Sequence, residues 1–359
     1  MRHDRTDSGI GAPTDEPIDP GLGPRVFNRR TIVWFAIGIA ILVALVTQLD
    51  LDVGRIIDTI RRADPSAFLA ALFVYYLTFP FRGWRWRRML RNAGIENPPG
   101  IGVLSMIIFL SWFANCLVPA KLGDVYRAYL LKKRGAVSLS FAGGTVVAER
   151  LIDLAFVLIV LGASALAIFR GRVPDRLGPF LEIGALGIFA AGLGLLALRR
   201  WPNLAARFLP RRFHAIYDRF QGGTLGAFGS YGQLVVLTSL GWLAEIVRFW
   251  LVGVSLGLFA NETVWSQLAI SAFVALGSAI FTTAAPTPGG LGAAELAIVA
   301  ALTLVGRGGE IAIAAALLDR LISYWSLIAF GTVAYFGWAV RDPDRGSSSV
   351  GTLSHARRD

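Results

Sequence analysis

Charged side chains inside long apolar segments are the features of this sequence best suited to chemistry. Glu149, Arg150 and Asp153 lie in the apolar run 141–169, about 13 to 19 Å from its start if the run is a helix. That depth is near the centre of a bilayer, where an arginine or aspartate costs about 2.5 to 3.5 kcal/mol, so these groups must face the protein interior and have partners. Glu149 and Asp153 are four residues apart and Arg150 and Asp153 are three apart, so each pair shares a helical face.

Two further apolar segments carry charges of the same kind. Asp319 and Arg320 repeat the acid–arginine arrangement, and Glu245 and Arg248 form another pair three residues apart. One interpretation is that these groups are structural ion pairs that neutralise each other. The other is that Arg150 and Arg320 bind a phosphate headgroup or exchange protons with the acids. The sequence leaves both interpretations open.

Two other apolar regions are interrupted by residues that cannot continue a helix. Residues 101–131 break at LVPAKLGD and residues 267–305 break at APTPGGLG. Half-helices beginning near Gly123 and Gly292 would aim unpaired N–H groups and a positive dipole end into a cavity, which is an anion site. A tight turn without a ligand is the alternative for PTPGG. The other candidate residues of the two breaks are Asn115, Lys121, Asp124, Arg127, Pro288, Gly289, Gly290 and Glu295.

The two breaks also resemble each other. The pattern Pro-x-x-Leu-Gly begins at Pro119 and again at Pro288, an offset of 169 residues, and Arg150 and Arg320 are offset by 170 residues. An odd number of crossings separates the copies, so they point in opposite directions and the two hairpins open on opposite sides. Inverted repeats with discontinuous helices are typical of secondary transporters, whose site lies near mid-membrane at the repeat interface.

The composition indicates an integral membrane protein. Of 359 residues 55% are hydrophobic and only 16% are charged, and mean hydropathy is +0.58. The net charge of +11 is concentrated between apolar runs, as in cytoplasmic loops that touch anionic headgroups, so a nucleic-acid binder is excluded. The single cysteine, Cys116, excludes an intrachain disulfide, and the three histidines lack ligand spacing. No metal or cofactor is expected.

These observations predict an all-α polytopic membrane protein with about six transmembrane helices and two re-entrant broken hairpins in an inverted repeat. The predicted crossings are 31–47, 66–81, 141–169, 180–198, 233–258 and 311–340. Residues 25–340 form a single transmembrane domain with repeat halves of about 31–169 and 180–340. Residues 1–24 and 341–359 are expected to be disordered tails.

The basic connections predict the orientation in the cell membrane. Arg82, Arg85 and the basic residues up to Arg91 are assigned to a cytoplasmic connection, where GWRWRR anchors the interface. This count places both termini in the cytoplasm. Residues 50–64 lie outside in this arrangement, and their pattern of isoleucines predicts a short interfacial helix.

Four segments resemble the marker segments of a known family. NCLVPAKLGDVYRAYLL, AERLID, PTPGGLGAAE and LLDRLISYW are similar to those of the lysylphosphatidylglycerol synthase transmembrane region, a family of flippase-like membrane proteins. The matching positions of the first marker are Asn115, Pro119, Gly123 and Arg127. Lys121 replaces an arginine and Asp124 a glutamate, and because lysine is a point charge the change weakens bidentate recognition. The resemblance covers residues 30–340 and implies lipid translocation or a related membrane-lipid role.

Three classes of function follow. The favoured class is a lipid or amphiphile transporter that binds an anionic headgroup at the repeat interface, with membrane lipids as partners. A non-transporting subunit that assists a membrane-protein partner in a lipid-processing complex is the alternative. An intramembrane lipid-modifying enzyme is disfavoured, because the apolar segments contain no histidine, HExxH motif or paired-aspartate metal motif. The synthase's soluble aminoacyltransferase domain has no counterpart in these residues, so lysine transfer is not expected and the protein is not expected to be an enzyme.

Overall fold

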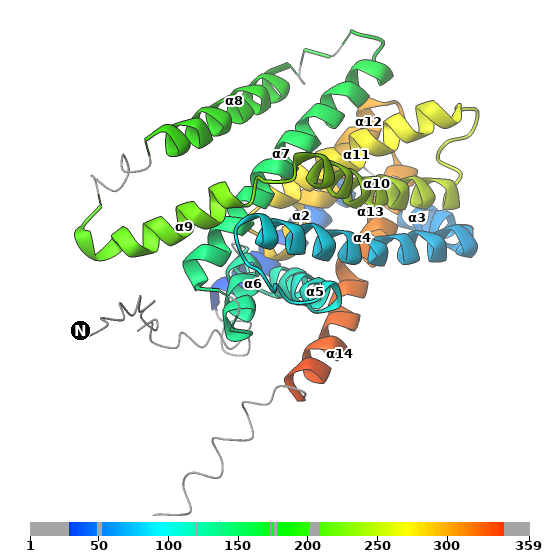
Figure 1. The fold of residues 1–359 in the computed structure, drawn as a ribbon. Coiled ribbons are helices and arrows are strands. Elements are labelled where there is room, and N and C mark those ends of the chain that lie inside the picture. Colours follow the sequence, from blue (N-terminus) through cyan, green and yellow to red (C-terminus); the bar gives the residue numbers. More distant parts are fainter. Residues whose placement is uncertain are drawn as a thin grey trace, which may run out of the picture.

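The described part of the chain is a bundle of helices (Figure 1). The computed structural model describes residues 29–48, 52–119, 121–135, 137–172, 174–175, 178–201 and 209–340, and within them it has no strand. Six helical runs there are long and apolar enough to cross a membrane. They are α4 (Pro65–Asn92), α7 (Leu139–Ile168), α8 (Gly178–Arg200), α10 (Tyr231–Ser255), α11 (Val264–Ala284) and the continuous run Glu310–Gly337. The prediction of an all-α polytopic membrane protein is therefore confirmed, while the predicted tails lie outside the described residues.

The helix lengths differ from the prediction in one place. The first predicted crossing, 31–47, corresponds to α2 (Arg29–Gln48), a helix of 20 residues that is about 30 Å long. Helix α11, expected to be one arm of a broken hairpin, has 21 residues and is about 31 Å long, as long as the predicted crossings. The reason is that the helix begins at Val264, capped by the Thr263 side chain, so the proline–glycine break comes only after a full-length arm.

Helix α4 continues well beyond its predicted end at residue 81. Its buried face extends through Trp86, Met89 and Leu90, all fully buried, and Pro80 is accommodated inside the helix. The residues after Phe81 are therefore not a loop, and the assignment of Arg82 and Arg85 to a cytoplasmic connection is wrong. A helical apolar periodicity that continues through the basic residues explains why the chain stays helical there.

The long helices α4 and α10 pack antiparallel along the core. The Asp64 N–H, before α4, donates to the Ser255 carbonyl at the end of α10 (2.8 Å). At the other end, the Asn92 side chain donates to the Ala227 carbonyl, just before α10 (3.1 Å). Consequently the segment that follows α4 and the segment that follows α10 begin at opposite ends of the bundle.

Each of these segments is a helical hairpin. The first consists of α5 (Ile101–Leu117) and α6 (Leu122–Lys133), and the second of α11, the turn η3 (Pro288–Gly290) and α12 (Ala293–Leu304). Since they follow the antiparallel helices α4 and α10, they enter from opposite ends, and their arms lie at opposite sides of Figure 1. At the base of the second hairpin Glu262 binds Arg307 (2.9 Å) and the Ser266 hydroxyl (2.6 Å), and these contacts lower the pKa of Glu262.

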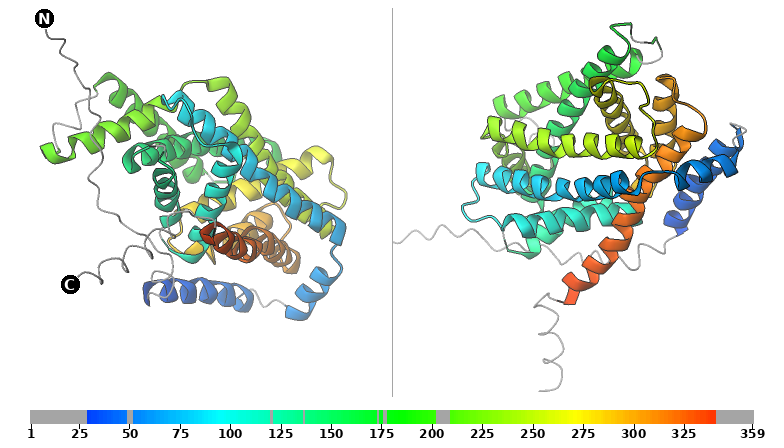
Figure 2. Two further views of the ribbon diagram at one scale, coloured as in Figure 1. Left: turned by 60° about the horizontal axis from the view of Figure 1, so that its bottom comes forward. Right: turned by 90° about the vertical axis from the view of Figure 1, so that its right-hand side faces the viewer.

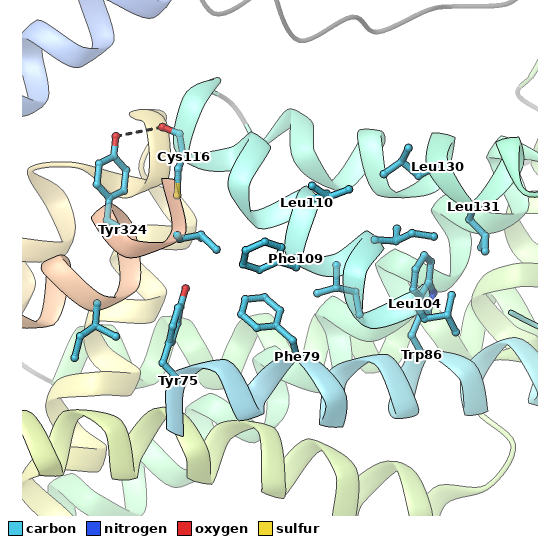
Figure 3. Close-up of a cluster of buried hydrophobic side chains, with 14 of the residues drawn as sticks. Tyr75, Phe79, Trp86, Leu104, Phe109, Leu110, Cys116, Leu130, Leu131 and Tyr324 are labelled. Atoms are coloured by element: carbon cyan, nitrogen blue, oxygen red, sulfur yellow. Dashed lines mark hydrogen bonds between the residues drawn. The ribbon is translucent and has the colours of Figure 1, made fainter. Parts of the chain in front are cut away.

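The tips of the two hairpins meet inside the bundle. The Tyr324 hydroxyl donates to the Cys116 carbonyl at the tip of the first hairpin (3.2 Å), as Figure 3 shows. Arg320 donates to the Gly289 carbonyl at the tip of the second hairpin (2.8 Å). Gly289 has φ +57°, and a Cβ there would lie 2.5 Å from the Tyr324 ring and 3.4 Å from the Cys116 Cα, so the approach requires glycine.

The last long helical run contains an irregular turn beside this meeting point. Helix α13 (Glu310–Arg320) leads into a π-helical segment, η4 (Leu321–Ser326), and then into α14 (Leu327–Val340). Tyr324 and Ser323 belong to η4. Single π-helical turns occur frequently at functional sites.

Smaller helices cover the sides of the bundle. The predicted amphipathic helix is α3 (Val53–Arg61), which buries Ile56 against α13 and leaves Ile57 exposed. In Figure 2, α2 and α3 run along one side of the bundle. Helix α9 (His214–Gly226), preceded by η2 (Arg211–Phe213), packs along α7, so part of the connection between the predicted crossings 180–198 and 233–258 is helical.

Candidate functional site

Buried charges from both halves surround the meeting point of the hairpins. Among the described residues the buried arginines and acids are equal in number. They are Arg82, Arg85, Arg127, Arg248 and Arg320, and Glu149, Asp153, Glu245, Glu295 and Asp319. Charges removed from water are tolerated only when they are paired, and each of these acids binds at least one of these arginines.

In the first half Arg85 of α4 binds both acids of α7. Its Nη1 lies 2.6 Å from Asp153 Oδ1, and its Nη2 lies 2.9 Å from Glu149 Oε1. Arg127 of α6 binds the other Glu149 oxygen (2.9 Å) and lies over the Trp86 ring. Three helices are therefore joined through one carboxylate pair, and the predicted proximity of Glu149 and Asp153 is explained by a shared arginine.

Arg150 pairs with a different acid from the one its spacing indicated. Its guanidinium binds Asp124 of α6 (2.7 Å), while Asp153, three residues along α7, faces α4 instead. In the second half Arg320 of α13 binds Glu295 of α12 (3.1 Å). Each pair thus joins the second arm of one hairpin to the helix that follows it.

A second type of pair also recurs in both halves. Arg248 of α10 binds Asp319 of α13, as Arg85 of α4 binds Glu149 of α7. Arg248 also binds Glu245 (3.0 Å), so the pair predicted from their spacing is present. The long helices α4 and α10 therefore make equivalent electrostatic contacts with α7 and α13.

Side chains already accept hydrogen bonds from the N–H groups of the two glycines at the start of the half-helices. The Gly123 N–H donates to Asn115 Oδ1 (2.8 Å), and the Gly292 N–H donates to Glu295 Oε2 (2.7 Å). The expectation of unpaired N–H groups at these two glycines is therefore wrong. The physical reason is that a buried amide without a partner is costly, so nearby side chains cap both positions.

A cavity of about 180 Å³ lies between the two halves, next to the hairpin tips. One water needs only about 10 to 15 Å³, so a larger polar group fits. Its charged lining comes from both halves: Arg82, Lys121, Arg150, Glu245, Arg248, Asp319 and Arg320. Asn115 and Gly289 line it as well, whereas the other predicted site residues are not part of its wall. Those others are Gly123, Asp124, Arg127, Glu149, Asp153, Pro288, Gly290, Gly292 and Glu295.

Arg82, Arg85 and two tryptophans are functional candidates that the sequence analysis missed. The Arg82 guanidinium lies between the rings of Trp112 (4.9 Å) and Trp242 (5.0 Å), 3.6 Å from Asp153. Sandwiching between aromatic faces stabilises a desolvated arginine. The available signal was the spacing of three between Arg82 and Arg85, which places both on the face that continues through Trp86.

Comparisons with known proteins find relatives that are named membrane proteins. A UPF0104 membrane protein of Methanocaldococcus jannaschii, MJ1078, is 32% identical over 228 residues, which cover 62% of this chain and 93% of that protein. A UPF0104 membrane protein of Methanothermobacter thermautotrophicus is 27% identical over 335 residues, covering 85% and 93%. The glycosyltransferase AglD of Haloferax volcanii is 27% identical over 337 residues, covering 83% of this chain but 53% of AglD. No solved structure matches the chain.

The family match covers most of the chain. The family described as the lysylphosphatidylglycerol synthase TM region matches residues 33–331, which include both hairpins, the long helices between them and all the charged residues of the cavity wall. The resemblance seen in the four marker segments is thereby confirmed. The protein belongs to the family of the lysylphosphatidylglycerol synthase transmembrane region.

Proposed function

We propose that this protein moves a lipid, or a lipid-like amphiphile, with an anionic headgroup across the cell membrane, and that the headgroup binds in the cavity between the halves. The observation that carries the proposal is the cavity itself, because its wall combines charged side chains of both halves with both hairpin tips. Sites of this kind, at the interface of inverted halves with broken helices, are typical of transporters.

The two equivalent ion pairs support an alternating mechanism. The side chains of Asp124 and Arg150 are 20% and 34% exposed, whereas those of Glu295 and Arg320 are 3% and 7% exposed. In a mechanism that rocks one half against the other, the exposed and buried pairs exchange roles. This structure then corresponds to the state accessible from the side of the first hairpin.

The distribution of charge supports the orientation that we propose. Arg87, Arg88 and Arg91 lie at the end of α4 from which the first hairpin starts. Basic residues concentrate on the cytoplasmic side of membrane proteins. The first hairpin then enters the membrane from the cytoplasm, the second enters from outside, and both termini are cytoplasmic.

Transport is favoured over catalysis because, among the described residues, both carboxylates of the cavity wall are already bound by an arginine. Glu245 and Asp319, the two acids that line it, both bind Arg248. His214, the histidine within the described residues, bonds to the Leu209 carbonyl and is not part of the cavity wall. A carboxylate that an arginine already binds is poorly suited to act as a general base, which must be free to accept a proton from the substrate.

A second candidate function is a non-transporting subunit of a lipid-processing complex. The match to 53% of AglD, which is named a glycosyltransferase, favours it because a region like this chain accompanies further sequence there. Reconstitution separates the two candidates. Purified full-length protein in liposomes should by itself accelerate exchange of labelled anionic phospholipid between leaflets, above protein-free liposomes. Exchange at the protein-free rate would reject transport and favour the subunit.

A further inference from the structure

The positive and negative side chains of the cavity wall and of its ion-pair partners are equal in number, with one exception. Five buried arginines face five buried acids, and the partly exposed Arg150 is matched by Asp124. Lys121 remains, a half-buried cation that lines the cavity. Among the described residues its ammonium group has neither a hydrogen bond nor an ion pair. Asp124, three residues later, uses both carboxylate oxygens for Arg150.

The other cations of the wall already have partners. Arg320 is occupied by Glu295, the Gly289 carbonyl and the Ser323 hydroxyl. Arg248 binds two acids, and Arg82 lies between two tryptophan rings with its Nε bonded to Thr78. An anion that enters the cavity therefore meets Lys121 as a cation that no carboxylate of the described residues binds directly.

The backbone holds Lys121 in an unusual conformation at this place. It has φ 53° and ψ 36°, the left-handed region, immediately before α6. Non-glycine residues adopt this conformation rarely, and such strain persists where the surrounding structure imposes it, often at ligand sites. Asn115 lines the same wall, and because its Oδ1 accepts the Gly123 N–H, its NH₂ group is the part left to donate to a ligand.

We propose that the cavity selects a headgroup with one net negative charge, of which the phosphodiester is the common membrane form, and that Lys121 and Asn115 bind its anionic oxygens. A single negative charge brings the buried network to neutrality. A phosphomonoester carries about −1.5 to −2 at pH 7, so it would leave uncompensated negative charge in a poorly solvated site. This inference rests on the proposed function and names the substrate class of the same site.

Equilibrium binding tests this proposal without requiring translocation. Purified full-length protein in detergent is titrated with four probes: phosphatidylglycerol (a diester), phosphatidic acid (a monoester), phosphatidylcholine (net neutral) and water-soluble glycerophosphoglycerol. The parent should bind phosphatidylglycerol about tenfold or more tightly than the monoester and the neutral lipid. Stronger binding of the lipid than of glycerophosphoglycerol identifies the ligand as a lipid headgroup, and equal binding identifies a free phosphodiester with the same chemistry.

Variants at Lys121 connect the preference to this residue. Lys121→Gln should lose about tenfold in phosphatidylglycerol affinity and most of the preference over the neutral lipid, whereas Lys121→Arg should keep both. Lys121→Gly removes the ammonium group and relieves the left-handed backbone, so it should fold well and bind as weakly as Lys121→Gln. The control Arg219→Gln neutralises an exposed cation on α9 and should bind like the parent.

Two results would overturn the inference: tighter binding of the monoester than of the diester, or an unchanged preference in both Lys121→Gln and Lys121→Gly. The proposed function fails separately. If the parent binds the diester with this preference but does not accelerate leaflet exchange, transport is rejected while the assignment of Lys121 stands.

Discussion

Arg150 and Arg320 make equivalent ion pairs in opposite halves of the molecule, each binding an acid on the second arm of the preceding hairpin. The pair of Arg150 with Asp124 is partly exposed, whereas the pair of Arg320 with Glu295 is almost fully buried. The same contact thus exists in two environments within one structure. This difference allows the structural and functional roles of the two arginines to be separated by experiment.

Arg320→Gln should destabilise the protein more than Arg150→Gln. Removing Arg320 leaves Glu295 buried without its partner, which costs about 3 to 5 kcal/mol, while Asp124 can still be solvated. We expect a clear drop in melting temperature for Arg320→Gln, and for Arg150→Gln a loss of lipid exchange with little change in melting temperature. Equal destabilisation by both variants would indicate that the two pairs are only structural.

Arg85→Gln should be far more damaging than Arg88→Gln, although both residues belong to GWRWRR. Arg85 is fully buried between Glu149 and Asp153, so its loss leaves two unpaired acids, at a cost of about 3 to 5 kcal/mol or more. Among the described residues Arg88 bonds to the Ser230 hydroxyl and to no acid, and it is partly exposed. Thermal melting and the yield of monodisperse protein measure the difference. If the segment is a surface anchor, both variants will behave alike.

Gly123→Ala should disrupt the first hairpin, whereas Gly143→Ala should be tolerated. A Cβ on Gly123 would lie 2.0 Å from the Ser111 carbonyl oxygen, and that backbone atom cannot move independently of α5. A Cβ on Gly143 in α7 meets no atom within 4 Å. We expect Gly123→Ala to lower the melting temperature and stop lipid exchange. Normal exchange in Gly123→Ala would mean that the hairpin tip adjusts without consequence.

Cysteine labelling tests the proposed orientation. In a background without Cys116, Asn261→Cys in the α10–α11 connection should react with an impermeant maleimide on intact cells. Gly100→Cys, at the base of the first hairpin, has open space around its Cα and should react only after permeabilisation. The opposite pattern would reverse the orientation, and labelling of both sites on intact cells would exclude hairpins that enter from opposite sides.

Much of the architecture follows from local sequence features, because breaks and apolar runs act locally. The proline–glycine breaks located both hairpin tips, and the pair of Glu245 with Arg248 followed from their spacing on one helix. The partner of Arg150 could not be predicted in this way, because Asp124 lies on another helix and the packing of the helices decides such contacts. The spacing within α7 therefore indicated Asp153, which binds Arg85 instead.

Arg82 and Arg85 show where composition misleads. Counting arginines between apolar runs placed them in a loop, because the positive-inside rule treats every arginine as part of a connection and does not consider arginines that are buried in the protein interior. Their helical spacing with Trp86 and Met89 contained the correct information. The capping of the Gly123 and Gly292 N–H groups could not be predicted from the sequence either, since it depends on where the side chains of Asn115 and Glu295 point.

Filling the cavity tests most directly whether the lipid headgroup passes through it. Ala279 of α11 lines the cavity and takes part in no ion pair, so Ala279→Trp should obstruct the space without breaking the charged network. Ala300 of α12 is exposed and lies outside the cavity wall, so Ala300→Trp is the matched control. In liposomes containing equal amounts of folded protein, exchange of labelled anionic phospholipid should fall to the protein-free rate for Ala279→Trp and stay at the parental rate for Ala300→Trp. Parental exchange by Ala279→Trp would contradict passage of the headgroup through this cavity.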